Sequence, residues 1–239
     1  MLSIVIPAFD EAKRIRPTLE GILRFLGTRN EASEILVVDD GSSDETARIV
    51  ESFAHPALRV LRNATNQGKG YSVRRGFLEA RGDWVLFTDA DLSTPIEELD
   101  TLLGAAHPEA DVVIGSRGID RTKILVHQSR FREFGGVFFN RIVRLVLRLP
   151  ILDTQCGFKL FRREKCALVF RRQRIPGFGF DAEILYLARK AGLVIREVPV
   201  IWRHDEATRV RFARDAVTMF VNLFQIRWNW ITGQYRSPV

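Results

Sequence analysis

The chain has 239 residues, of which 46% are hydrophobic, and a net charge of +7, a balance that suits one globular domain with a sizeable core. No stretch approaches the roughly 18 uninterrupted apolar residues of a membrane-spanning helix, and Met1-Leu2-Ser3 leads straight into a strand-like run rather than a signal peptide. The two cysteines, Cys156 and Cys166, lack the spacing of a zinc site, so we expect a reduced, cytoplasmic protein.

Short apolar runs alternate with amphipathic ones along the first half of the chain. The expected strands cover residues 2–7, 34–38, 58–61, 84–88 and 111–114. The expected helices cover 10–26, 43–53, a segment that ends at 80 after a turn at 66–70, and 96–106. Strands that alternate with helices at this pace predict an α/β fold, in which helices cover both faces of a mostly parallel sheet.

The strand at 84–88 ends in two carboxylates, Asp89 and Asp91, with one residue between them. Alternate residues of an extended chain point the same way, so both acids can project from the C-terminal edge of the sheet, where open α/β sheets bind ligands. Two acids at such an edge repel each other unless a cation lies between them. A hard divalent cation that also binds substrate phosphates suits this place. The alternative is that both acids cap the next helix, since Ser93 and Pro95 suit a helix start.

Other acids follow the other strands: Glu11 comes after the first strand, and Asp39 and Asp40 come after the second. The stretch 63–70 is no Walker A motif, because Asn and Gly stand where that motif needs Gly and Ser or Thr. No GxGxxG follows the first strand either. Each acid alone is well explained as a solvated turn residue. Together they indicate recognition of a base and ribose, with a pyrophosphate carried by a metal.

The charge divides near residue 117. Residues 1–116 carry 12 Lys/Arg and 19 Asp/Glu, a net charge of −7, whereas residues 117–239 carry 24 and 10, a net charge of +14. We interpret these stretches as two halves of one domain that covers residues 1–239. The acidic half can hold a cation, and the basic half attracts anions such as nucleic acid, an anionic membrane or a phosphorylated substrate. Arginine suits phosphate well, although genomic base composition explains the arginine excess equally well.

Several motifs resemble those of family 2 glycosyltransferases with a GT-A (Rossmann-like) fold: residues 3–11 (SIVIPAFDE), 37–42 (VVDDGS) and 89–91 (DAD). Motifs of the second half are similar to the polyprenyl-phosphate branch, above all to dolichyl-phosphate β-glucosyltransferases: residues 153–161 (DTQCGFKLF), 180–183 (FDAE), 197–202 (EVPVIW) and 226–233 (IRWNWITG). The resemblance implies inverting transfer of a hexose, with glucose from UDP-glucose as the first candidate, onto a polyprenyl or dolichyl phosphate.

The resemblance also implies roles for single residues. Those expected to bind the nucleotide sugar are Pro7, Glu11, Asp39, Asp40, Lys69, Asp89 and Ala90. Asp91, with Asp89 beside it, is expected to bind Mg²⁺ or Mn²⁺. Relatives that use mannose often carry Gln two positions after the second Asp, where this chain has Ser93, a poorer ligand that weakens the mannose alternative. The chain also lacks the N-terminal membrane helix of the eukaryotic glucosyltransferases, which favours a bacterial or archaeal setting and peripheral attachment to the inner face of the membrane.

The acceptor side follows from the chemistry of phosphate. A phosphate monoester is largely ionised at neutral pH and can attack without a strong general base. The protein must instead hold two anions close together, which requires a metal and several cations. The candidates for the acceptor phosphate are Arg117, Arg130, Arg132, Lys159, Arg209 and Arg211, each of which could also be a plain surface charge. Asp153 or Asp181 could orient the acceptor or serve as a base, or each could be a buried acid paired with an arginine. Asp91, Asp153, Asp181 and Arg117 are therefore the catalytic candidates.

Two segments are amphipathic enough to lie in a membrane interface, residues 134–149 and 212–231. Arg141, Arg144 and Arg148 share one helical face of the first, and the second contains Trp228 and Trp230, residues that concentrate at membrane surfaces. The same helices could instead pack on the core or form a homodimer.

Three rival functions remain open. The nearest is a GDP-mannose-dependent transferase with the same lipid acceptor. Another is transfer to a saccharide hydroxyl, which would need Asp153 or Asp181 as a committed base. The third is a non-enzymatic basic module that binds nucleic acid or membrane. The acids at the sheet edge would repel a phosphate backbone, so we expect no nucleic-acid partner.

Overall fold

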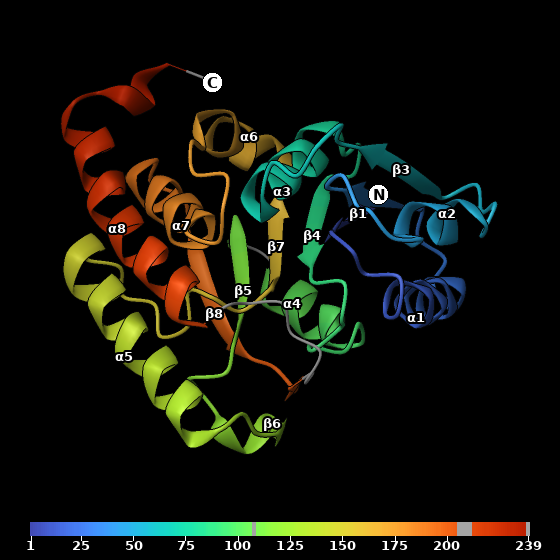
Figure 1. The fold of residues 1–239 in the computed structure, drawn as a ribbon, viewed down its shortest axis with the longest axis horizontal. Helices are drawn as coiled ribbons and strands as arrows, with labels where there is room; N and C mark the ends of the chain where they lie inside the picture. Colours follow the sequence, from blue (N-terminus) through green and yellow to red (C-terminus); the bar gives the residue numbers. More distant parts are fainter. Residues whose placement is uncertain (107–108, 205–211, 238–239) are drawn as a thin grey trace.

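The computed structural model describes residues 1–106, 109–204 and 212–237, and seven strands of these residues form one mixed sheet (Figure 1). The strands are β1 (Leu2–Ala8), β2 (Ser33–Asp39), β3 (Leu58–Arg62), β4 (Trp84–Thr88), β5 (Val112–Ser116), β7 (Phe158–Arg162) and β8 (Ile195–Pro199). Their order in the sheet is β3-β2-β1-β4-β7-β5-β8. Strands from both halves of the chain therefore share one sheet.

The sheet is parallel except at β7, which confirms the predicted mostly parallel architecture. β1 pairs with β2 and β4, β2 with β3, and β5 with β8, all in parallel, whereas β7 runs antiparallel between β4 and β5. Because β7 runs in the opposite direction, its first residues lie at the C-terminal end of β4. The backbone N–H of Asp89 accordingly donates to the carbonyl of Gly157 over 3.2 Å. The motif at 153–161 is thereby brought to the ligand-binding edge of the sheet.

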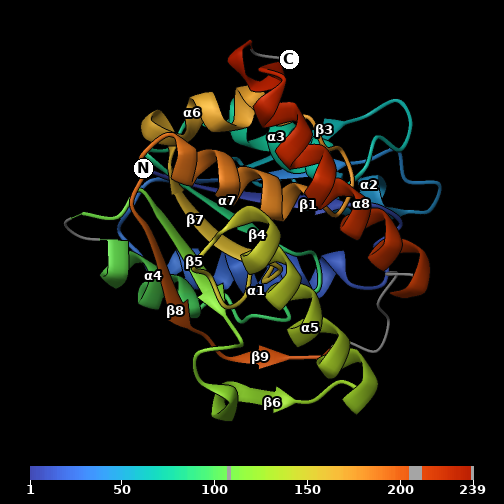
Figure 2. The same cartoon turned by 90° about the vertical axis from the view of Figure 1, so that its left-hand side faces the viewer.

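Helices cover both faces of the sheet, as predicted (Figure 2). One face packs against α1 (Ile15–Gly27), α2 (Thr46–Glu51) and α4 (Glu98–Ala106); the other packs against α3 (Lys69–Glu79), α5 (Arg130–Leu147), α6 (Arg163–Arg172), α7 (Phe180–Lys190) and α8 (Phe212–Ile231). Within β1, Ile4 and Ile6 point into the core beneath α1, α2 and α4, and Val5 points into the core on the opposite face of the sheet. This alternation is the reason why the strand is apolar throughout.

Two helices begin later than the sequence predicts. Asp10 has a φ of 52°, which ends the extended chain in a turn, and α1 starts only at Ile15. That turn is fixed because Asp10 Oδ1 accepts from Ser43 N (2.8 Å). After β4, the helix α4 starts at Glu98, so neither Asp89 nor Asp91 is its N-cap, and the capping alternative is wrong.

The remaining elements are η1 (Arg121–Lys123), β6 (Ile124–Val126), β9 (Trp202–Arg203) and η2 (Gln234–Arg236). Strands β6 and β9 form a separate two-stranded sheet. Helices α5 and α8 pack side by side along one flank of the molecule in both views (Figures 1 and 2). Among the described residues, no helix is both long and apolar enough to cross a membrane.

Candidate active site

A cavity of about 840 Å³ lies at the C-terminal edge of β1, β2, β4 and β5. Most of the predicted site residues line it: Pro7, Glu11, Asp40, Lys69, Asp89, Ala90, Asp91, Arg117, Arg132 and Asp181. Asp39, Asp153 and Lys159 are buried behind its wall. Arg209 and Arg211 lie outside the described residues, and the side chain of Arg130 is not described either. The cavity thus brings residues from both halves of the chain together.

The carboxylates of Asp89 and Asp91 lie on the cavity wall between two cations. Lys69 Nζ is 2.6 Å from Asp89 Oδ1, and Arg14 Nη1 is 3.9 Å from Asp91 Oδ2. Burial and the charge of Asp89 raise the pKa of Asp91, although a hydrogen bond from Ser93 N opposes the shift. A cation bound beside Asp91 would therefore stabilise the ionised form of its carboxylate.

Gly157 leaves the space that the Asp89 carboxylate occupies. A Cβ atom at position 157 would lie 1.9 Å from Asp89 Oδ2. Any other residue would displace that carboxylate from the cavity wall, because ordinary contacts are nearly twice as long. The glycine of the 153–161 motif is thus part of the acidic site.

Asp40 shapes the turn that carries Lys69 as well as lining the cavity. Its carboxylate accepts from Gln67 N (3.0 Å), Gly68 N (2.8 Å) and Asn63 Nδ2 (2.6 Å). Gly68 has a φ of 102°, which a residue with a side chain rarely adopts. The turn therefore aims Lys69, the first residue of α3, at Asp89.

Glu11 is held by Arg14, a cavity residue that the sequence interpretation missed. Arg14 Nε and Nη2 donate to the two carboxylate oxygens of Glu11 over 2.6 and 2.7 Å. The two residues are three positions apart, a spacing that brings side chains together in a helical turn and could have revealed the pair. Arg14 thus connects Glu11 with Asp91.

Lys159 has a different position from the one expected for a ligand of the acceptor phosphate. Its side chain is 0% exposed, donates to the carbonyl of Cys156 over 2.5 Å and forms an ion pair with Asp181. Burial raises the pKa of Asp181, opposed by the charges of Lys159 and Lys69. We correct the expectation for Lys159: it orients Asp181 from behind, and Asp181 is the member of the pair that reaches the cavity.

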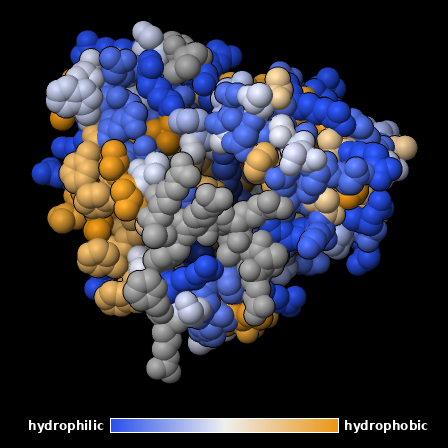
Figure 3. Space-filling model, viewed as in Figure 1, coloured by the Kyte–Doolittle hydropathy of each residue, from blue (hydrophilic) through white to orange (hydrophobic). Residues whose placement is uncertain are grey.

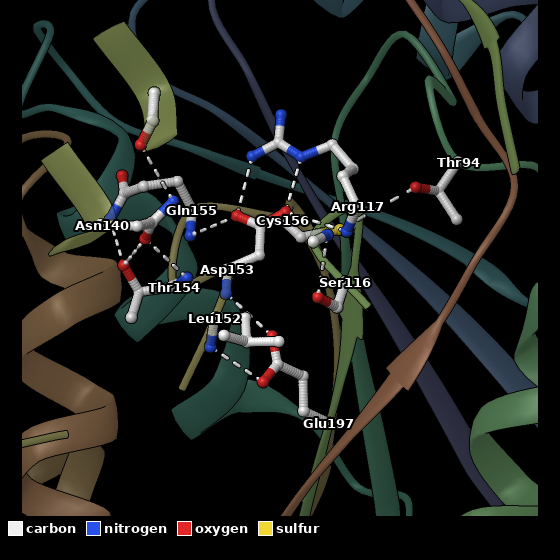
Figure 4. A network of polar contacts seen from close by, with 12 residues as sticks. Thr94, Ser116, Arg117, Asn140, Leu152, Asp153, Thr154, Gln155, Cys156 and Glu197 are labelled. Atoms are coloured by element: carbon white, nitrogen blue, oxygen red, sulfur yellow. Dashed lines mark hydrogen bonds and ion pairs between the residues drawn. The ribbon is translucent and has the colours of Figure 1, made fainter. Parts of the chain in front are cut away.

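Arg117 and Asp153 form a bidentate pair (Figure 4). Arg117 Nε donates to Asp153 Oδ2 over 2.6 Å and Nη2 to Oδ1 over 2.8 Å. Burial alone would raise the pKa of Asp153, but the guanidinium overcomes it and lowers that pKa to about 2. Glu197 fixes the loop from the other side, where it accepts from the backbone N–H groups of Leu152 (2.9 Å) and Asp153 (2.7 Å). An acid with so low a pKa is a poor base, so the geometry favours an orienting role for Asp153.

The cavity wall contains further residues that the sequence interpretation left unassigned: Asn140, Gln155, Phe178, Trp202 and His204. The guanidinium of Arg117 lies over the Trp202 ring, 5.2 Å from its centroid. Asn140 of α5 accepts from Thr154 N (3.0 Å) and Thr154 Oγ1 (2.9 Å), which ties α5 to the loop of Asp153 (Figure 4). No local pattern indicates such contacts, because the partners come from distant parts of the chain.

The side chains of the cavity can supply part of the coordination shell of a hard divalent cation. Within residues 1–106, 109–204 and 212–237, no three His, Cys, Asp or Glu side chains gather as a metal site. Asp89 and Asp91 supply two carboxylates. Mg²⁺ typically takes one or two carboxylates and completes its shell with water and substrate phosphates, so this pair fits such an ion.

Known proteins resemble this chain in sequence and in fold. Residues 3–170 match the sequence profile described as "Glycosyl transferase family 2". A dolichyl-phosphate beta-glucosyltransferase of Trichomonas vaginalis is 35% identical over 94% of this chain and 70% of its own length. Those of Saccharomyces cerevisiae and Homo sapiens are 33% and 31% identical, over 99% and 98% of this chain and 77% of their own lengths.

Two solved structures share the fold at lower identity. Mannosyl-3-phosphoglycerate synthase from Rubrobacter xylanophilus has a TM-score of 0.72 at 20% identity, over 99% of this chain and 75% of that one. Glucosyl-3-phosphoglycerate synthase from Mycobacterium tuberculosis, crystallised with Mn²⁺ and UDP-glucose, has a TM-score of 0.68 at 20% identity, over 100% of this chain and 80% of that one. Both are similar in fold, and the profile match covers more than half of the sequence. The chain belongs to glycosyl transferase family 2.

Proposed function

We propose that this protein transfers glucose from UDP-glucose to the phosphate of a polyprenyl or dolichyl phosphate, with inversion at the anomeric carbon. The observation that carries the proposal is the cavity itself, which joins an acidic strand edge to a basic wall and lies between helices with exposed apolar faces. The relatives named for this activity span nearly the whole chain and support the choice of acceptor. In this proposal residues 1–116 bind the donor, and residues 117–239 bind the acceptor.

On the donor side, Pro7, Glu11 and Asp40 surround the base and ribose. The buried Asp39 acts through the loop after β2, where its carboxylate accepts from Ser42 N over 3.2 Å. Lys69, Asp89 and Ala90 lie beside the diphosphate. Asp89 and Asp91 hold Mg²⁺ or Mn²⁺, which when bound neutralises charge on the departing diphosphate. Arg14 lies near Asp91 and Lys69 pairs with Asp89, so the negative charge of the site is balanced from two sides.

On the acceptor side, Arg117 and Arg132 bind the lipid phosphate, and Arg130, Arg209 and Arg211 remain candidates. Arg132 lines the cavity without an acidic partner among the residues described, so its guanidinium is available to an anion. Asp153 fixes the plane of the Arg117 fork. The ionised phosphate attacks directly, and Asp181, next to Lys69 and Lys159, orients it within the cavity.

A lipid surface is the proposed location of the enzyme, as a peripheral protein on the inner face of the membrane. The outward side of α8 is an apolar band: Val217, Phe220, Val221, Phe224, Trp228 and Ile231 are exposed. An apolar area is visible over α5 and α8 on one flank of the molecule (Figure 3). The inner sides of the same helices line the cavity at Arg132, Asn140 and Met219. A lipid acceptor could therefore reach the cavity along these helices without leaving the membrane.

A transfer assay tests the proposal. Purified protein, Mn²⁺ and a polyprenyl phosphate are incubated with radiolabelled UDP-glucose or GDP-mannose, and the lipid is extracted into organic solvent. We expect label in the organic phase from UDP-glucose alone and its loss in Asp91→Ala. Label from GDP-mannose alone would replace the donor assignment. If neither donor labels the lipid, but UDP-glucose is consumed once saccharides are added, a hydroxyl is the acceptor and the proposal fails. Light scattering tests the homodimer as the competing use of the apolar band.

A further inference from the structure

The exposed face of α5 changes character along the helix axis. Phe134, Val137 and Phe138 are exposed in its first half, and Phe134 is 68% exposed. Arg141 and Arg144 are exposed on the same side of the second half, around Leu145, which is 79% exposed, and Arg148 follows as the exposed C-cap residue of the helix. The sequence predicts an arginine stripe beside an apolar surface. The structure instead puts both on one outward face, with aromatic residues in one half and arginines in the other.

The three arginines form a cluster without internal compensation. Within the part of the chain that the structure describes, none of them has an acidic or hydrogen-bonding partner. The helix carries one acid, Glu133, which lies at the opposite end and is paired with Arg121 and His127. Like charges one turn apart repel each other, and a bound anion would relieve that repulsion.

The cluster borders a hollow that is separate from the catalytic cavity. It is a shallow depression of the surface, lined by the three arginines with Leu145, Leu149 and Pro150. It is open to solvent and shares no residue with the cavity at the sheet edge. Guanidinium groups bind phosphate oxygens through two parallel hydrogen bonds, so three of them around one hollow suit a phosphate group.

We propose that Arg141, Arg144 and Arg148 bind the headgroups of anionic phospholipids, at a site distinct from the acceptor site. The inference rests on the lipid surface of the proposed function and adds a preference for anionic lipid. Phe138, one turn before Arg141 on α5, is exposed, and the neighbouring α8 exposes apolar side chains such as Phe224. A nucleic-acid backbone would satisfy the arginines but leave those side chains in water, whereas a lipid bilayer accommodates both.

The arrangement also fixes how the enzyme meets the membrane. Phosphates bound at the cluster hold the second half of α5 at headgroup level, so the aromatic first half can insert more deeply. The inner side of that first half lines the catalytic cavity at Arg132 and Gly136. The site therefore turns the mouth of the cavity toward the lipid.

Vesicle flotation tests the inference with the full chain. Vesicles of phosphatidylcholine alone are compared with vesicles of phosphatidylcholine mixed with phosphatidylglycerol. The test variant is Arg141→Gln/Arg144→Gln/Arg148→Gln. The matched control is Lys13→Gln/Arg24→Gln/Lys165→Gln, which removes the same charge from exposed positions elsewhere. A Phe224→Ser/Trp228→Ser variant probes the apolar band. Circular dichroism and UDP-glucose binding show that each variant is folded.

We expect phosphatidylglycerol to strengthen binding of the unaltered protein and of the matched control by about 100-fold, an advantage that the test variant loses and that high salt suppresses. If the test variant keeps that advantage, or the control loses it equally, the headgroup site is overturned while the lipid surface stands. If the Phe224→Ser/Trp228→Ser variant is the only variant that loses binding to both vesicle types, the result supports the apolar band as the part of the surface that enters the lipid. If the unaltered protein binds neither vesicle, the inference and the proposed lipid surface fail together.

Discussion

The sides of the cavity that we propose for the donor and for the acceptor are built in different ways. The donor side consists of acids at the C-terminal ends of parallel strands, and its central carboxylates, Asp89 and Asp91, face the cavity beside Lys69 and Arg14. On the acceptor side, two of the cavity groups, Arg117 and Asp181, are each fixed by a buried partner of opposite charge. One side exposes its charges to a ligand, and the other orients them from behind.

The pKa directions express the same difference. Burial and a neighbouring acid raise the pKa of Asp91, whereas the Arg117 guanidinium overcomes burial and lowers the pKa of Asp153 to about 2. An acid with a raised pKa gains from a bound cation, and an acid with a lowered pKa already has one. Removal of an acid should therefore affect chemistry on the donor side and geometry on the acceptor side.

The largest effect is expected for Asp91→Asn. Loss of this charge removes stabilisation of the departing diphosphate, so kcat/KM for transfer should fall about a thousandfold. Calorimetry should also show weaker Mn²⁺ binding in the presence of UDP. Glu20→Gln, which removes an exposed acid from α1, serves as the control and should leave both quantities unchanged. Full activity in Asp91→Asn would contradict the proposed role of the donor-side carboxylates in the chemical step.

Asp153→Asn should have a smaller and different effect. Because the Arg117 fork loses its partner, KM for the lipid phosphate should rise about 10- to 100-fold, while KM for UDP-glucose stays the same. The Asp153 carboxylate is ionised throughout pH 5 to 9, since its pKa is about 2, so the loss should not vary with pH.

A second substitution separates orientation from base catalysis. In Arg117→Gln/Asp153→Asn the two losses should not add, because both remove one contact to the acceptor. If Asp153→Asn instead abolishes kcat and removes a limb of the pH profile, Asp153 is the base of a transferase that acts on hydroxyl groups.

The contrast also explains what the sequence could predict. The strands of the donor side follow from local apolar runs, and the spacing of Asp89 and Asp91 is a local feature at the end of one strand. The acceptor side depends on pairs far apart in sequence, 36 residues for Arg117 and Asp153 and 22 for Lys159 and Asp181. Membership of a motif predicted that Lys159 matters but not that it is buried. The antiparallel insertion of β7, which brings Gly157 against Asp89, leaves no periodic pattern either.

Lys159→Met extends the comparison to stability. The substitution leaves the Asp181 carboxylate buried without its partner, which should lower the free energy of unfolding by about 3 kcal/mol. In calorimetry this corresponds to a fall in Tm of about 6 to 12 °C for a domain of this size. Lys159→Met/Asp181→Asn should regain a large part of that loss, because no unpaired charge remains. An unchanged Tm in Lys159→Met would mean that the pair does not support the acceptor wall.

The smallest effect is expected for Tyr235→Phe. This substitution tests how much the hydrogen bond of Tyr235 stabilises the acceptor wall. Tyr235 Oη donates to Glu183 Oε1 over 2.6 Å, and the same carboxylate accepts from the backbone N–H groups of Arg174 (3.0 Å) and Ile175 (2.9 Å). Loss of one hydrogen bond to a buried carboxylate should cost about 1 to 2 kcal/mol in the free energy of unfolding. The 174–178 segment reaches the cavity at Phe178, so hydrogen exchange should quicken at Ile175 and hardly change at Asp40. Equal quickening at both positions would show that the two sides of the cavity loosen together and would contradict their separate construction.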